Sequence, residues 1–252
     1  MRKNGLQKTK LPSMSMTLPL HIQQAQKKAV ARIASGFDRF LLYEFQYLEE
    51  HRAFAGTHFL QNAKSFKEQF SADLAKMDEN ERQDYAEFMI EEYTKAVEVL
   101  PRLQWYAQFL VVYSSFEHAL NELCRIVKNR SGFSLSQKDL EGQGVRRAAN
   151  YLCKVANVHP PFQSPEWNRA LLLGEIRNVI AHRNGEIEFN LNDKKSLSHR
   201  IQGVHGLQLK QIVTGMEDAE LVLDTDFVRD AIKVLRKVLT DIANYPLYDN
   251  EG

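Results

Sequence analysis

The stretch Glu175-Ile-Arg-Asn-Val-Ile-Ala-His-Arg-Asn-Gly185 decides the fold of this chain. Its apolar side chains, together with the leucines before it, recur at the spacing of an amphipathic helix. They are Leu171, Leu172, Leu173, Ile176, Val179 and Ile180. Asn184-Gly185 then supplies a helix stop, because both residue types tolerate a left-handed backbone. With Pro165-Glu166-Trp167 at its start, the pattern predicts a half-buried helix that ends at about Arg183.

Three polar residues stand within this apolar pattern. Arg177, Asn178 and His182 would lose desolvation energy there unless they are paired or used. Arg177 carries a fixed fork of donors that suits a phosphate group, and His182 can move protons near neutral pH. Asn178 is the i, i+4 neighbour of His182 and can bond either the histidine or a substrate. The alternative interpretation is a surface arginine, a helix-capping histidine and a structural asparagine.

Helical periodicity extends over most of the chain. Beyond the segment above, it predicts helices over residues 19–50, 58–75, 78–100, 103–127, 145–156 and 227–242. Asp224 or Asp226 is expected to cap the last of these helices. Residues 128–143 and 186–200 are expected to be loops. Residues 207–213 and 221–223 have strand composition and predict a small β-hairpin, so the predicted fold class is all-α with this hairpin near the C-terminus.

The spacing of Arg177, four residues and His182 resembles the signature of the HEPN superfamily, whose all-helical domains often act as metal-independent ribonucleases. Residues 113–124 look like the first core helix of that family, and residues 146–155 are similar to its connecting helix. The resemblance covers roughly residues 101–245. It implies a HEPN-type helical bundle over 101–245, preceded by a helical extension over 19–100 and a disordered basic tail over 1–18.

By this resemblance, the chain is expected to be an endoribonuclease of a bacterial toxin or antiphage defence type. His182 would act as general acid or base on an oxygen, and Arg177 would stabilise the charge that develops on the phosphoryl group. Asn178 would complete the catalytic set. Glu117 could pair with Arg177 and orient it, or be an exposed acid. No cofactor and no metal are implied.

The expected partners also follow from the resemblance. RNA is the expected substrate, and Arg146, Arg147 and Arg183 could track its backbone, although charged helix faces are usually only solvated. HEPN nucleases typically assemble the site from two protomers, so a homodimer with the motif helix in its interface is expected. In ideal helix geometry Arg177 and His182 point roughly 140° apart, which suits a composite site. An antitoxin or regulatory protein is a further expected partner.

The amino-acid composition limits the functions and the cellular location that we expect for this chain. No run of apolar residues is long enough for a membrane span, and Cys124 and Cys153 fit a reducing, cytoplasmic compartment. Residues 1–37 contain seven Lys/Arg and no Asp/Glu, whereas residues 38–100 contain seven Lys/Arg and fourteen Asp/Glu. Two other functions therefore stay open. One is a non-catalytic HEPN dimer that binds RNA or regulates, and the other is a helical scaffold whose acidic residues 38–100 dock another chain.

Overall fold

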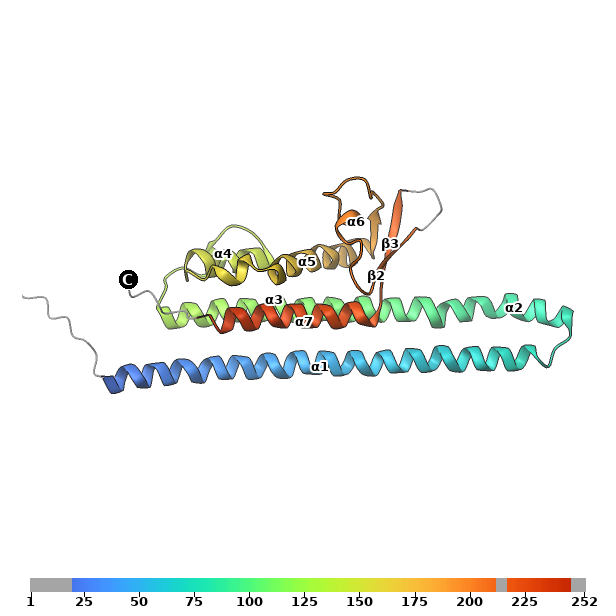
Figure 1. The fold of residues 1–252 in the computed structure, drawn as a ribbon, viewed down its shortest axis with the longest axis horizontal. Coiled ribbons are helices and arrows are strands. Elements are labelled where there is room, and N and C mark those ends of the chain that lie inside the picture. The colour runs from blue at the N-terminus through green and yellow to red at the C-terminus, as the bar shows by residue number, and fades with distance from the viewer. Residues whose placement is uncertain (1–19, 212–216, 246–252) are drawn as a thin grey trace, which may run out of the picture.

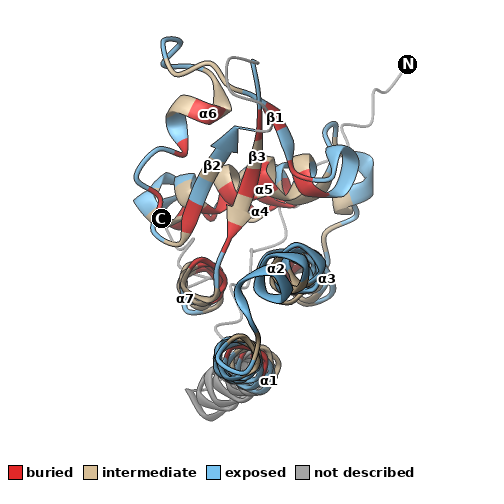
Figure 2. Ribbon diagram, turned by 90° about the vertical axis from the view of Figure 1, so that its right-hand side faces the viewer, coloured by how far each residue is buried: buried red, intermediate tan, exposed pale blue. Residues whose placement is uncertain are grey.

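Long helices run side by side along the molecule (Figure 1). The computed structural model describes residues 20–211 and 217–245, without the side chains of residues 20–36, 38, 39, 41, 42 and 131. Helix α1 (Leu20–Leu74) is antiparallel to a continuous run made of α2 (Glu79–Thr94), a π-helical turn (Lys95–Val99) and α3 (Leu100–Ser131). The closing helix α7 (Thr225–Ala243) lies beside α3 and above α1 (Figure 2).

Helix α1 corrects the prediction of two separate helices over 19–50 and 58–75. It continues without a break for 55 residues. The linking residues 51–57 contain no proline and no cap, and Gly56 is buried where a Cβ would lie 3.3 Å from Thr225 Oγ1. Glycine disfavours a helix, so Gly56 suggests a break between two helices when only the sequence is considered. Close packing at Gly56 explains why a glycine stands inside the helix.

The turn between α1 and α2 is well specified by sequence. The Asp78 side chain accepts from the backbone N–H of Asn80 and Glu81, and the Glu81 carboxylate accepts from the Asp78 N–H. This capping box confirms the predicted helix start at residues 78–81. Pro101 lies in the first turn of α3, directly after the π-helical turn, which joins α2 to α3 without interrupting the rod.

Helices α4 (Gly144–Lys154) and α5 (Pro165–Arg183) form a layer above α3 and α7, and short 3₁₀ turns (Gln137–Asp139, Pro160–Gln163) flank α4 (Figure 2). The core lies between this layer and the long helices. Phe109 and Phe116 of α3 are fully buried, and the Phe109 ring meets Phe227 of α7 edge-on at 5.1 Å. Full burial of each such side chain contributes about 1.5–3 kcal/mol to the free energy of folding. Because α3 carries two of them, it is a central element of the fold.

A small sheet covers the far end of α5. Its strands β1 (Glu186–Glu188), β2 (Leu207–Gln211) and β3 (Asp218–Leu223) are antiparallel in the order β1-β3-β2. The pairing of β2 with β3 confirms the predicted hairpin, although its residues 212–216 lie outside the described residues. The predicted loop 186–200 is wrong in part, because it contains β1 and the short helix α6 (Leu197–Arg200). The fold is thus mostly helical with a three-stranded sheet, and the basic tail predicted over 1–18 lies outside the described residues.

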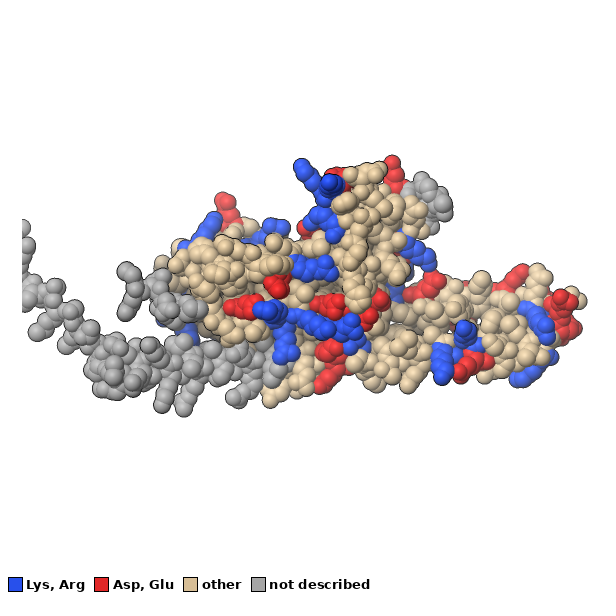
Figure 3. All heavy atoms as spheres, viewed as in Figure 1, with Lys and Arg blue, Asp and Glu red and all other residues tan. Residues whose placement is uncertain are grey.

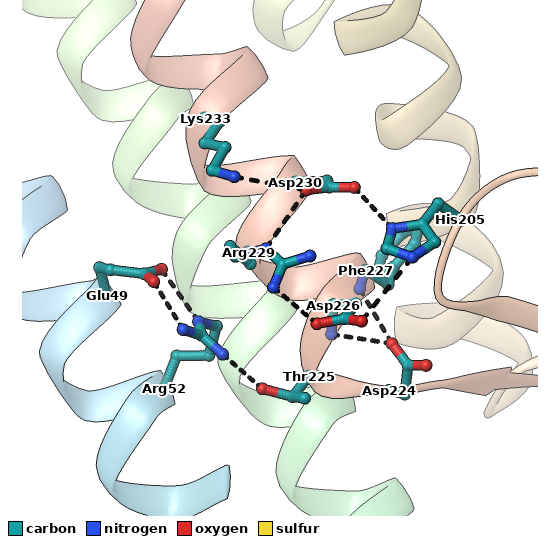
Figure 4. Close-up of polar contacts among 10 residues, drawn as sticks. All are labelled: Glu49, Arg52, His205, Asp224, Thr225, Asp226, Phe227, Arg229, Asp230 and Lys233. Atoms are coloured by element: carbon teal, nitrogen blue, oxygen red, sulfur yellow. Dashed lines mark hydrogen bonds and ion pairs between the residues drawn. The ribbon is translucent and has the colours of Figure 1, made fainter.

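The N-terminus of α7 is tied to the rest of the molecule by polar contacts (Figure 4). The Asp224 side chain caps the helix by accepting from the N–H of Asp226 and Phe227, which settles the choice between the two predicted caps. Arg52 of α1 donates to Thr225 Oγ1 at 2.6 Å, and His205 Nδ1 lies 2.9 Å from Asp230. These contacts fasten α1 and the segment before β2 to the first two turns of α7.

Candidate functional site

Helix α5 has the bounds that its sequence predicts. Ser164 caps its start by accepting from the Trp167 N–H at 3.1 Å. Its end is set by Asn184 and Gly185, which have φ angles of 51° and 88° in the left-handed region. The predicted helix stop is therefore confirmed, and His182 and Arg183 occupy the last turn.

Two tyrosines of α3 fix α5 against the core. Tyr113 lies so close to Gly174 that its hydroxyl would overlap with a Cβ there, and Tyr106 lies equally close to Gly185. The Tyr106 hydroxyl also donates to the Leu221 carbonyl of β3. The two tyrosines are seven residues apart on one side of α3, and the two glycines bound the segment that carries the polar motif. The pair therefore sets the position of residues 174–185 on α3.

These tyrosine–glycine contacts were not predicted from the sequence. Tyr113 and Tyr106 are buried, with 4% of each residue exposed. An isolated glycine within a helical pattern, such as Gly174, is the one sequence signal of close approach. That signal does not identify the residue that approaches.

The polar motif lies on the outer side of α5. Arg177 is half-buried, whereas Asn178 and His182 are exposed. The helix buries a separate face, made of Trp167, Ala170, Leu173, Ile176 and Ile180. The expectation of polar side chains desolvated within an apolar surface is therefore wrong for Asn178 and His182, because the helix turns them away from the core.

Arg177 and Asn178 bond to each other. The Arg177 guanidinium donates to Asn178 Oδ1 at 3.0 Å. The amide oxygen of Asn178 thus orients the arginine, and Asn178 makes no bond to His182. Within the described part of the chain, His182 has no hydrogen bond or ion pair, so its ring is open to a ligand from solvent.

Charged groups from three helices gather around the Tyr113 hydroxyl. Burial raises the pKa of Tyr113 above its usual value, the Glu117 carboxylate raises it further, and Arg177 and Arg146 oppose this rise. These three charged residues come from α3, α5 and α4, so the fold brings together predicted site residues that are far apart in sequence. Of the two alternatives for Glu117, an ion pair with Arg177 or an exposed acid, the ion pair is not formed between the described side chains, and Glu117 is half-buried. Instead Glu117 Oε1 lies 3.0 Å from the Cβ position of Gly144, at the start of α4.

The basic residues near the site differ in their exposure and in their charged partners. Arg146 is exposed and helps to lower the pKa of Glu175, whose main partner is Arg200 at 3.0 Å. Arg183 is exposed and Arg147 is half-buried. On the face shown in Figure 3, Lys and Arg side chains alternate with Asp and Glu among the described residues. That face therefore carries no broad basic surface among the described residues.

The described residues hold no cluster of three or more His, Cys, Asp or Glu side chains that could bind a metal ion. None of the described helices is long and apolar enough to cross a membrane. Comparison with known proteins gave no match to a family model, to a curated protein or to a solved structure.

The residues near the end of α5 offer an unpaired imidazole, an oriented guanidinium and two further arginines. These groups can transfer a proton and stabilise an anion at one end of α5.

Proposed function

We propose that this protein is a metal-independent endoribonuclease of HEPN type. The supporting observation is the position of Arg177 and His182 on the last turns of α5. His182 is exposed and has no partner within the described residues, while Asn178 orients the Arg177 guanidinium. A general acid or base must be free to reach its proton, and an electrostatic group must be held in place. The two side chains meet these two different requirements.

The proposed reaction is attack of a ribose 2′-OH on the adjacent phosphodiester. His182 of one protomer accepts the 2′-OH proton as the O2′–P bond forms. The P–O5′ bond breaks, and the leaving 5′ oxygen takes a proton from water. Arg177 stabilises the negative charge on the phosphoryl oxygens, and Arg146 and Arg183 hold the RNA backbone. The products are a 2′,3′-cyclic phosphate and a 5′-hydroxyl end.

This activity suits a toxin or antiphage effector that acts on cytoplasmic RNA and is held in check by an antitoxin or regulatory protein. The proposal requires a homodimer, because a single α5 points Arg177 and His182 in different directions. No cofactor enters the reaction as written, since the arginines supply the positive charge.

The test is an RNA cleavage assay with the full-length protein. Mixed RNA is incubated with and without excess EDTA, and the product ends are analysed. Cleavage is expected to persist in EDTA and to leave cyclic or 3′-phosphate ends. A 2′-O-methyl copy of one RNA that is cleaved is the matched control and should stay intact, because it lacks the attacking hydroxyl. Activity that EDTA abolishes and only added magnesium restores would contradict the proposal.

A further inference from the structure

The described side chains of helix α1 form two apolar faces, and only one of these faces is covered by other described residues. The covered face includes Phe45 and Ala55, which pack against the core. The other face carries four aromatic side chains, with the tyrosine pair stacked at 6.3 Å. We call these residues the aromatic seam: Phe40, Tyr43, Tyr47 and Phe54, with 44%, 50%, 61% and 75% of each exposed.

The spacing of the aromatic seam is that of a helix-packing stripe. Phe40, Tyr47 and Phe54 follow one another at intervals of seven residues, and Tyr43 lies between the first two. At 100° per residue, all four side chains fall within about 60° of one another around the helix. A heptad repeat of this kind keeps one stripe of a helix facing a partner helix. The partner expected from the spacing is therefore another helix, not a flat surface or a small ligand.

The aromatic seam is also symmetric along the chain. Tyr47 lies midway between Phe40 and Phe54, seven residues from each. If two copies of α1 are antiparallel with a two-fold axis at Tyr47, each Phe40 meets Phe54 of the other copy. The same operation places Tyr43 opposite His51, which is exposed and can share a hydrogen bond with a phenol. A two-fold contact requires such self-complementarity, because the same surface is used twice.

The exposed aromatic area supplies a large part of what a dimer needs. With about 200 Å² for each aromatic side chain, the exposed fractions leave roughly 900 Å² of aromatic surface over two copies. A specific interface buries about 1,200–2,000 Å² in total, so the polar residues that border the aromatic seam have to supply only the remainder. By contrast, none of the large exposed hydrophobic side chains in the described part of the chain lies on α5.

We infer that a second copy of this chain docks on the aromatic seam of α1, antiparallel, with the two-fold axis at Tyr47. Helix α1 lies on the opposite side of α3 and α7 from α5 (Figure 2). A copy docked there leaves Arg177 and His182 uncovered. The contact is therefore separate from the pairing of motif helices in the proposed nuclease, and it holds or fails independently of that activity.

The first test is the mass of the assembly in solution. Phe54→Lys places a charge in the aromatic seam, and Leu60→Lys is the matched control. Leu60 lies on the same helix, is 72% exposed, and points about 120° away from Phe54. Light scattering of the full chain should show that Phe54→Lys halves the wild-type mass, with at least about a 30-fold weaker dissociation constant, as for an interface hot spot. Leu60→Lys should keep the wild-type mass, and circular dichroism should be unchanged in both.

A wild-type mass of one chain, 29.1 kDa, at all concentrations would overturn the inference, and so would equal effects of the two substitutions. Cross-linking then tests the orientation. Tyr47→Cys should form an intermolecular disulfide on oxidation, because the residue faces itself at the axis. Phe54→Cys alone should not, although a mixture of Phe40→Cys and Phe54→Cys chains should. Disulfide formation by Phe54→Cys alone would refute the antiparallel arrangement. Wild-type protein, which retains Cys124 and Cys153, is the oxidation control.

Discussion

The two residues of the proposed catalytic pair, Arg177 and His182, differ in burial and in hydrogen bonding. Arg177 is half-buried and bonds to Asn178, whereas His182 is exposed at the last turn of α5. An exposed side chain without partners contributes little to folding, typically within ±0.5 kcal/mol. A loss of activity on removal of His182 therefore reports on chemistry and not on stability.

We predict that His182→Ala lowers the rate of RNA cleavage by about 10²–10⁴-fold, the usual cost of losing a general acid or base. Arg177→Ala should lower it by about 10²–10³-fold, the usual cost of losing an electrostatic stabiliser of the transition state. The melting temperature should hardly change for His182→Ala. His118→Ala is the matched control, because His118 is also an exposed histidine, on α3. The measurement is single-turnover cleavage together with thermal unfolding. Full activity in both site variants would refute the assignment.

For single residues, the sequence suggested candidates for the site but not how their side chains are held. Glu117, Arg146 and Arg177 were singled out from three separate segments, and all three act on Tyr113. The predicted desolvation of the motif was wrong, because a helix with one buried face can turn Asn178 and His182 outward. Which side a single polar residue faces depends on where the neighbouring helices pack, and periodicity alone does not fix this.

The end of α5 depends on one glycine. A Cβ at Gly185 would overlap with the Tyr106 hydroxyl, and the φ of 88° disfavours other residues. We predict that Gly185→Ala lowers the free energy of unfolding by about 2–4 kcal/mol, through backbone strain and overpacking together. Urea unfolding of the two variants provides the measurement.

Gly203→Ala is the control for Gly185→Ala. Gly203 has a similar φ of 71°, but a Cβ there would meet nothing within 4 Å. It should therefore cost only about 1 kcal/mol, from the left-handed backbone alone. Equal losses for the two variants would show that Tyr106 does not determine the end of α5.

Elements with strong local signals were predicted well. The bounds of α5, the capping box of α2 and the cap of α7 all follow from local side-chain chemistry. Strand β1 was missed because its three residues carry no pattern of their own. Its buried residue Ile187 pairs with Ala219 of β3, a strand that lies more than thirty residues later. The single helix α1 was missed because Gly56 is buried where a larger side chain would crowd Thr225, and periodicity does not show this close packing.

At the scale of the molecule, the proposed site depends on two protomers. We predict that inactive His182→Ala and Arg177→Ala chains, refolded together, recover part of the wild-type cleavage activity. The mixed dimer contains one intact His182 and one intact Arg177, and a composite site can combine them. Each variant refolded alone is the control. Full activity of a strictly monomeric wild-type protein would contradict the two-protomer site.

Helix α1 also determines how the protein moves in solution. Its 55 residues extend about 80 Å, whereas a compact chain of this length would be roughly 45 Å across. A rod of this length tumbles and diffuses more slowly than a sphere of equal mass. On a gel-filtration column calibrated with globular standards, even a single chain would elute early and be mistaken for a dimer. Any claim about the number of chains must therefore come from a method that weighs the particle and is insensitive to its shape.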